Sequence, residues 1–356
     1  MKKIDKILLI SVIILSLFGL LMIYSSSSIW ATYKYNDPYK YLKSQAIFLI
    51  LGYFIIFITS KVDYHLYKKY SNHILIISII LLILVLIPGI GTIRNGSRSW
   101  FGIGSFGIQP SEFAKLGLII FTSKYLTRNK IKDIKSSVLP ILLIVLLIFG
   151  LIMLQPDFGT GVIIVITIVA LLFVSGVNMS FFIKIGLLGL IGVVILVIIA
   201  PYRLERITSF LNPWKDPLGS GFQIIQSMYA IGPGGLLGMG LGNSIQKHFY
   251  LPEPQTDFIF SIISEELGFA GILIVTTLFI TIIYRSITIS IKQEDNFAKY
   301  LSFGITFSLA FQTLLNLMVV VGLIPVTGVT LPFLSYGGSS LLISLVSIGI
   351  VLNISK

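Results

Sequence analysis

Acidic side chains at the edge of an apolar segment are the residues of this chain best suited to chemistry. The stretch 251–268, LPEPQTDFIFSIISEELG, begins as a proline-rich polar turn and continues into a segment apolar enough for a membrane helix. Asp257 lies at the junction, and Glu265 and Glu266 lie inside the apolar part. Ionisable groups are costly within a membrane and commonly mark functional sites there. These three carboxylates are therefore the first candidates for a functional site.

Each of these carboxylates also has a structural interpretation. Asp257 could be the N-cap or a first-turn acid of the helix that follows it. Glu265 lies roughly 12 Å further along the helix axis, at about 1.5 Å per residue. Glu265 and Glu266 are adjacent, so they point about 100° apart on a helix and cannot share one face. We expect this pair to be a structural or coupling element in contact with a neighbouring helix.

Cations and amides at helical spacing precede these carboxylates. Arg203 and Arg206, in YRLERI, are three residues apart, so a helix places both guanidinium groups on one face. Such a fork suits phosphate oxygens, although an interfacial helix could equally bind anionic lipid headgroups. Gln223 and Gln226 repeat this spacing. Lys247 follows a glycine-rich stretch that is no P-loop, because no GK[ST] follows, and no dinucleotide fingerprint, because no strand precedes it.

A second group of polar residues lies between the earlier apolar segments. Glu112 and Lys115 are three residues apart at the start of the fourth segment, on one face of a helix. They form either an internal ion pair or a polar wall of a substrate cavity. Asp157, in QPDFGTG, either caps the next helix or lines the same cavity. Arg98 precedes them in an outer loop.

The composition sets the class of protein. The 356 residues are 55% hydrophobic and only 11% charged, with a mean hydropathy of +0.97, whereas a soluble domain carries roughly 25% charged residues. With repeated apolar runs, this indicates an all-α, polytopic membrane protein. The net charge of +12 does not indicate a nucleic-acid partner, because the basic residues lie in loops between spans. The chain has no cysteine, and its three histidines have no metal-ligand spacing.

Ten segments are predicted to cross the membrane within a single domain covering 1–356. They are 7–28, 44–60, 73–88, 112–127, 138–154, 161–176, 181–201, 258–284, 300–322 and 338–354. With the N-terminus inside, the inner loops carry 16 lysines and arginines and the short outer loops carry 6. Both termini are therefore expected in the cytoplasm.

The outer loops carry the unusual sequence features. The largest, 202–257, lies between the seventh and eighth spans and is expected to form an interfacial helix and a glycine-rich turn. The last, 323–340, is uncharged and rich in proline and glycine, which predicts a segment folded back into the protein at membrane depth. The chemistry is therefore expected to face outward.

Four motifs in this order resemble one family. NGSRSWFGIG…QPSEFAK, QPDFGTG, LPEPQTDFIFSIISEELG and PVTGVTLPFLSYGGSS look like the SEDS family of bacterial cell-shape, division and sporulation proteins (RodA, FtsW and SpoVE). The resemblance covers essentially the whole chain and is greater to the FtsW/SpoVE branch.

The resemblance implies an activity and a location. A SEDS protein is expected to be an inverting peptidoglycan glycosyltransferase of the bacterial cytoplasmic membrane that polymerises lipid II, a disaccharide-peptide on undecaprenyl pyrophosphate. A class B penicillin-binding protein is its expected partner, and a divalent cation, Mg²⁺ or Mn²⁺, its possible cofactor. The family's essential aspartate matches Asp257, which becomes the candidate general base. The outward cations that could hold pyrophosphate are Arg203, Arg206, Arg98, Lys115 and Lys247.

Two other function classes fit parts of the pattern. A lipid II flippase would suit the intramembrane acids and the interrupted segments, but it needs polar groups through the whole membrane depth, and here they cluster outside. A noncatalytic division scaffold would need exposed partner surfaces and no Asp257. The sequence does not separate division, elongation and sporulation roles.

Overall fold

The computed structural model describes residues 4–94, 96–103, 106–128, 137–199 and 201–356. Its long helices are α1 (Lys6–Tyr35), α2 (Lys40–Thr59), α3 (Tyr64–Leu86), α4 (Pro110–Arg128), α6 (Leu139–Met153), α7 (Phe158–Val174), α8 (Met179–Ile199), α11 (Ile259–Ile291), α12 (Asn296–Val320) and α13 (Gly338–Ile354). Each of the ten predicted spans overlaps one of these helices, which confirms the all-α class.

Length and hydropathy separate these helices into groups. Six of those in the described residues are long and apolar enough to cross a membrane: α1, α2, α3, α8, α11 and α12. Three shorter ones, α6, α7 and α13, are apolar as well. The remaining helix, α4, begins with the charged residues Glu112 and Lys115. Ten crossings therefore stay a prediction.

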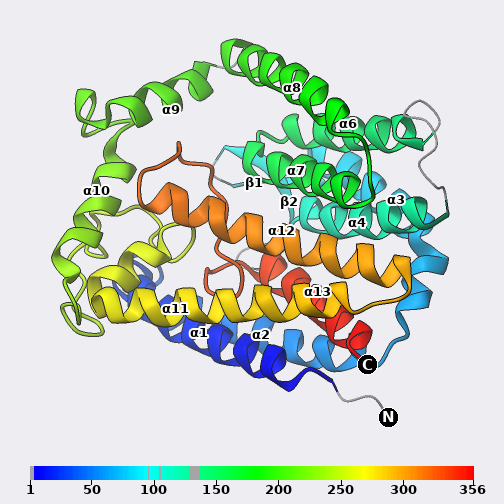
Figure 1. Ribbon diagram of the computed structural model, residues 1–356. Coiled ribbons are helices and arrows are strands. Elements are labelled where there is room, and N and C mark those ends of the chain that lie inside the picture. The colour runs from blue at the N-terminus through cyan, green and yellow to red at the C-terminus, as the bar shows by residue number, and fades with distance from the viewer. Residues whose placement is uncertain (1–3, 95, 104–105, 129–136, 200) are drawn as a thin grey trace.

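Long helices lying side by side form the body of the protein (Figure 1). α11 packs between α1 and α12, α12 also contacts α4 and α7, and α2 packs on α13. The backbone N–H of Asp5, before α1, donates to Ser355 Oγ, after α13, over 3.3 Å. The start of the first helix and the end of the last therefore lie together, on one side of the bundle.

α8 differs from the other long helices. It lies at the edge of the molecule in Figure 1, at the top of the view, and none of the described side chains in its most apolar stretch is buried. A helix that is apolar on all sides and unburied is suited to a lipid environment.

The loop before α4 folds into a small sheet that the sequence did not predict. β1 (Thr92–Arg94), β2 (Ser97–Ile103) and β3 (Phe106–Ile108) pair antiparallel in the order β1-β2-β3. Ser339 Oγ at the start of α13 donates to Gly107 O over 2.9 Å. The sheet is thereby attached to the beginning of α13.

The large loop contains more helix than expected. α9 (Pro201–Leu211) and the short turn η1 (Pro213–Lys215) lead to a second helix, α10 (Phe222–Ile231), and then to η2 (Gly232–Gly234). A single interfacial helix was expected, so α10 is an addition. Figure 1 shows α9 and α10 running down one end of the bundle toward the start of α11.

α11 is interrupted at Gly268, whose backbone is non-helical (φ 60°, ψ −153°). The interruption releases helix peptide groups, and the glycine-rich loop pairs with them. The carbonyls of Glu265 and Glu266 accept from the N–H groups of Met239 and Gly240, each over 2.9 Å. Beyond the interruption, the N–H groups of Phe269 and Ala270 donate to Gly235 O (2.9 Å) and Leu236 O (3.0 Å). Peptide groups without helical hydrogen bonds are tolerated at membrane depth only where other segments of the protein cover them.

Candidate functional site

Asp257 lies in the turn that leads into α11, and its side chain is half-buried. The N-cap residue of α11 is Phe258, and no side chain caps this helix. The carboxylate is therefore not used as the N-cap, which was its alternative interpretation. It accepts a hydrogen bond from Thr256 Oγ1 over 2.6 Å. Thr256 thus orients the Asp257 carboxylate, which does not cap the start of α11.

Burial raises the pKa of the Asp257 carboxyl above its ordinary value. The hydrogen bond from Thr256 and the positive charge of Arg206 oppose this shift without cancelling it. Loss of water penalises the ionised form, so the carboxylate holds a proton more tightly than an exposed aspartate does. A higher proton affinity makes Asp257 a stronger general base.

A cavity of about 410 Å³ is lined by residues of α9, α10 and the segment before Asp257, although Asp257 itself is not one of its lining residues. α9 contributes Glu205 and Arg206 to its lining, α10 contributes Gln223, and the loop segment before Asp257 contributes Pro252. Arg206 Nη1 donates to Val326 O, also in the lining, over 2.8 Å. The predicted residues Arg206 and Gln223 therefore meet at one cavity, with a guanidinium close enough to influence Asp257. Its volume is in the range of small-molecule sites.

Gln226 and Arg203, which were predicted to act together with Gln223 and Arg206, are placed differently. Gln226 lies one turn further along α10 than Gln223 and does not line this cavity. Arg203 lies in α9, but its side chain is outside the described residues. Of the two guanidinium groups predicted to form a fork, the structure therefore describes only that of Arg206.

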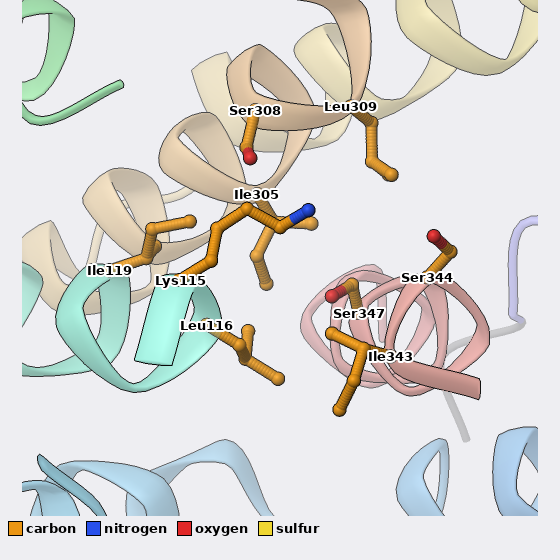
Figure 2. Close-up of a pocket in the computed structure, with 9 residues that line it drawn as sticks. All are labelled: Lys115, Leu116, Ile119, Ile305, Ser308, Leu309, Ile343, Ser344 and Ser347. Carbon is orange, nitrogen blue, oxygen red and sulfur yellow. The ribbon is translucent and has the colours of Figure 1, made fainter. Parts of the chain in front are cut away.

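Glu112 and Lys115 form a buried ion pair, with Lys115 Nζ 2.8 Å from Glu112 Oε2. Lys115 Nζ also donates to Gln312 Oε1 of α12 over 2.7 Å. Figure 2 shows Lys115 reaching from α4 into the space between α12 and α13. The void beside it, about 10 Å³, holds at most about one water molecule. These two residues do not line the cavity at Arg206.

Asp157 is the N-cap of α7, where it accepts from Thr160 N over 3.2 Å. It also accepts from Gln109 Nε2 (2.9 Å) and Ser111 Oγ (3.4 Å), just before and within α4. Burial, and to a smaller extent the charge of Glu112, raise its pKa, while its hydrogen bonds oppose the shift. The capping interpretation therefore describes Asp157, which joins the starts of two helices.

Arg98 and Lys247 are likewise committed to protein contacts. Arg98, in β2, donates from Nη1 to Leu86 O at the end of α3 over 3.4 Å. Lys247 is 5% exposed and its Nζ lies 2.9 Å from Glu266 Oε1. Their predicted contacts with substrate phosphate stay untested, and the structure gives both side chains internal partners.

Glu265 and Glu266 hold the large loop against α11. Glu265 accepts from Ser244 Oγ (2.5 Å) and from Ile245 N (2.9 Å). Glu266 accepts from Ser25 Oγ of α1, 2.7 and 2.6 Å from its two oxygens. These contacts are of the coupling kind expected from the sequence.

Two amides in α12 were not singled out in the sequence. Asn316 Nδ2 donates to Asp257 O over 2.7 Å and to Val329 O over 2.8 Å. Gln312 Nε2 donates to Thr330 O over 3.0 Å. Their spacing of four residues inside an apolar span is a signal that could have identified them.

The described residues contain no group of three or more histidine, cysteine, aspartate or glutamate side chains placed to hold a metal ion. The expected Mg²⁺ or Mn²⁺ stays untested, because such an ion is commonly held by one or two carboxylates together with substrate phosphates.

Comparison with known proteins identifies the chain. The cell cycle protein family model FtsW/RodA/SpoVE matches residues 5–356. The chain belongs to the FtsW/RodA/SpoVE family. Stage V sporulation protein E of Bacillus subtilis (strain 168) is 51% identical over 354 residues, covering 99% of this chain and 97% of the relative. A probable peptidoglycan glycosyltransferase FtsW of Geobacter sp. (strain M18) is 41% identical over 353 residues, covering 99% of this chain and 96% of the relative.

Solved structures of the FtsW/RodA/SpoVE family share the fold. One chain comes from a study of how a peptidoglycan synthase complex coordinates polymerization and crosslinking. It superposes with a TM-score of 0.81 at 32% identity, covering 99% of this chain and 97% of that one. The rod shape determining protein RodA of Thermus thermophilus gives a TM-score of 0.74 at 28% identity, covering 99% and 96%. The chain is thus a multi-pass membrane protein.

Proposed function

We propose that this protein is a peptidoglycan glycosyltransferase that polymerises lipid II into uncrosslinked glycan strands at the outer face of the cytoplasmic membrane. The observation that carries the proposal is the half-buried Asp257, whose raised proton affinity suits a base and whose carboxyl is acted on by the charge of Arg206, a lining residue of the cavity. The relatives named as probable peptidoglycan glycosyltransferases support the reaction class.

The reaction joins two sugars with inversion at the donor carbon. The 4-hydroxyl oxygen of the acceptor forms a bond to the anomeric carbon of the donor as the bond from that carbon to the pyrophosphate oxygen breaks. The hydroxyl proton passes to the Asp257 carboxylate, and the electron pair of the broken bond leaves with undecaprenyl pyrophosphate. General-base catalysis of this kind contributes about 10²–10⁴-fold to a rate.

Arg206 is the cation best placed to stabilise the leaving group. It lines the cavity and its charge acts on Asp257, whereas Lys115 and Lys247 are buried in ion pairs. Fixed positive charge is most effective where negative charge develops in the transition state. We therefore place the pyrophosphate on the side of the cavity formed by α9, with Gln223 opposite as a hydrogen-bonding group.

A class B penicillin-binding protein is the proposed partner. The similar chain in the peptidoglycan synthase complex supports this, because that complex combines polymerization with crosslinking. The partner would crosslink the strands that this protein makes. A divalent cation, Mg²⁺ or Mn²⁺, that assists the departure of the pyrophosphate stays part of the proposal.

The decisive experiment is a polymerisation assay with the purified protein, its penicillin-binding partner and lipid II. Long glycan strands separated by gel electrophoresis are the expected product. A parallel arm with lipid II in vesicles measures whether the protein moves lipid II between leaflets without joining it. Transport without polymerisation would support a flippase instead, and neither activity would support a noncatalytic scaffold.

A further inference from the structure

Two buried amides on one face of α12 connect the candidate base to the rest of the protein. Gln312 and Asn316 are four residues apart, so they lie one above the other on the helix. Both side chains are 1% exposed. Burying an amide N–H group is costly unless it is paired, so each hydrogen bond that Gln312 Nε2 and Asn316 Nδ2 donate contributes to holding its acceptor in place.

The two amides hold consecutive peptide groups of the loop 321–337. Gln312 Nε2 donates to Thr330 O and Asn316 Nδ2 donates to Val329 O. This loop has no regular structure around these residues, and Val329 is buried. The α12 amides therefore supply hydrogen bonds that a helix or strand would otherwise supply to its own backbone.

Only Asn316 extends this arrangement to Asp257. The same Nδ2 donates to the Asp257 carbonyl oxygen over 2.7 Å. The carbonyl carbon and the side chain of Asp257 are bonded to the same Cα atom, so holding the carbonyl restricts the direction in which the carboxylate leaves the backbone. Gln312, by contrast, is tied through Oε1 to Lys115 and has no contact with Asp257 among the bonds that the structure describes.

We propose that Asn316 is a positioning residue for Asp257, holding its backbone against the Val329 segment so that the carboxylate faces the acceptor hydroxyl. This rests on the proposed function, and it adds a residue that touches neither substrate nor reacting atoms. A displacement of about 1 Å in a reacting group can cost about 100-fold in rate. The contribution of Asn316 is therefore to kcat rather than to substrate affinity.

The test compares two isosteric substitutions in the full-length protein with its penicillin-binding partner. Asn316→Leu removes both hydrogen bonds at nearly constant volume, and Gln312→Met removes the two bonds of Gln312, to Thr330 O and from Lys115 Nζ, without touching Asp257. We expect Asn316→Leu to lower kcat for lipid II polymerisation by about 100-fold with little change in KM. Gln312→Met should lose much less activity. Asn316→Ser, which keeps one donor, should fall between wild type and Asn316→Leu and guards against a fold that does not tolerate leucine.

Hydrogen exchange on the same proteins gives a readout that does not depend on activity. Asn316→Leu should speed exchange in the turn 255–258 and around Val329, whereas Gln312→Met should speed it around Thr330 and leave the turn unchanged. A wild-type kcat in Asn316→Leu would overturn the proposal. So would losses of kcat in Asn316→Leu and Gln312→Met that are equal and follow the decrease in their melting temperatures. If wild type does not polymerise lipid II, the proposed function fails, and unchanged exchange in the turn would then reject the positioning role separately.

Discussion

Lys247 Nζ lies 2.9 Å from Glu266 Oε1, and the two side chains form an ion pair that is almost completely buried. Ser25 Oγ of α1 donates to the same carboxylate, and Lys247 Nζ also donates to Gly242 O over 2.5 Å. The pair therefore joins three segments that are far apart in the sequence: α1, the glycine-rich loop and α11. A buried pair with additional hydrogen bonds on both partners can repay the cost of removing its charges from water.

Breaking this pair on one side should destabilise the protein strongly. Glu266→Gln leaves the Lys247 ammonium buried without its counter-charge, which costs about 3–5 kcal/mol in other buried pairs. Thermal unfolding in detergent should show a lower melting temperature. The double variant Glu266→Met with Lys247→Met removes both charges and should recover much of the loss. Equal destabilisation of the single and double variants would show that the charge pairing is not the cause.

The break in α11 should depend on glycine at position 268. Its φ of 60° is disfavoured for other residues, and a Cβ there would lie 2.4 Å from Gly238 N. Gly268→Ala should therefore lower stability, with backbone strain alone of about 1–3 kcal/mol. Gly186→Ala in α8 is the matched control, because nothing lies within 4 Å of its added Cβ. Melting temperatures that fall equally in both variants would contradict this explanation.

The pH dependence of polymerisation should reflect the buried base. Because burial raises the pKa of Asp257, activity should be lost at a higher pH on acidification than an ordinary aspartate, with a pKa of about 3.9, would give. Arg206, whose charge lowers this pKa, makes a second check possible. Arg206→Gln should move the acidic limb of kcat/KM to still higher pH, and an unmoved limb would argue against the electrostatic contact.

The free energy of unfolding should also depend on the ionisation of Asp257, and its raised pKa sets the direction of that dependence on pH. The folded-state pKa of Asp257 is raised, so its contribution to stability is present below the unfolded pKa of about 3.9 and is lost as pH rises through the folded value. Replacing it with a neutral amide removes that loss. Asp257→Asn should therefore melt at the same temperature as wild type, or higher, at neutral pH, and its advantage should shrink at acidic pH.

Arg206 should matter for substrate use more than for folding. Arg206→Ala removes an exposed guanidinium at the cavity, so we expect kcat/KM for lipid II to fall by about 10–100-fold, equivalent to roughly 1.4–2.7 kcal/mol. Lys292→Ala, at an exposed position after α11, is the control and should retain full activity. A comparable loss of kcat/KM in both variants would show that general surface charge, and not the position of Arg206 at the cavity, causes the effect.

The sequence predicted the helices well because apolar periodicity and length decide them. All ten predicted spans overlap helices, and the resemblance to SEDS proteins identified the family. The β1–β3 sheet and α10 were missed, since short elements in outer loops form through tertiary contacts such as Ser339 with Gly107. Ser339 and Gly107 are 232 residues apart, so their contact leaves no local pattern in the sequence.

The predicted site was only partly assembled by the fold. Arg206 and Gln223 meet at one cavity, but Lys115 and Lys247 are paired inside the protein. Charge type and spacing could not distinguish a cation that faces substrate from one that faces a buried glutamate. Asn316 was overlooked for the opposite reason, because a neutral amide in an apolar span attracts little attention although its two hydrogen bonds reach Asp257 and Val329.

The most direct measurement is lipid II polymerisation by the purified protein with its penicillin-binding partner, comparing wild type with Asp257→Asn. The substitution keeps the size of the side chain and removes the base. We expect glycan strands from wild type and a loss of at least about 100-fold in Asp257→Asn, with binding of the partner and the melting temperature at neutral pH preserved. Strands formed by Asp257→Asn at close to the wild-type rate would contradict the assignment of Asp257 as the general base.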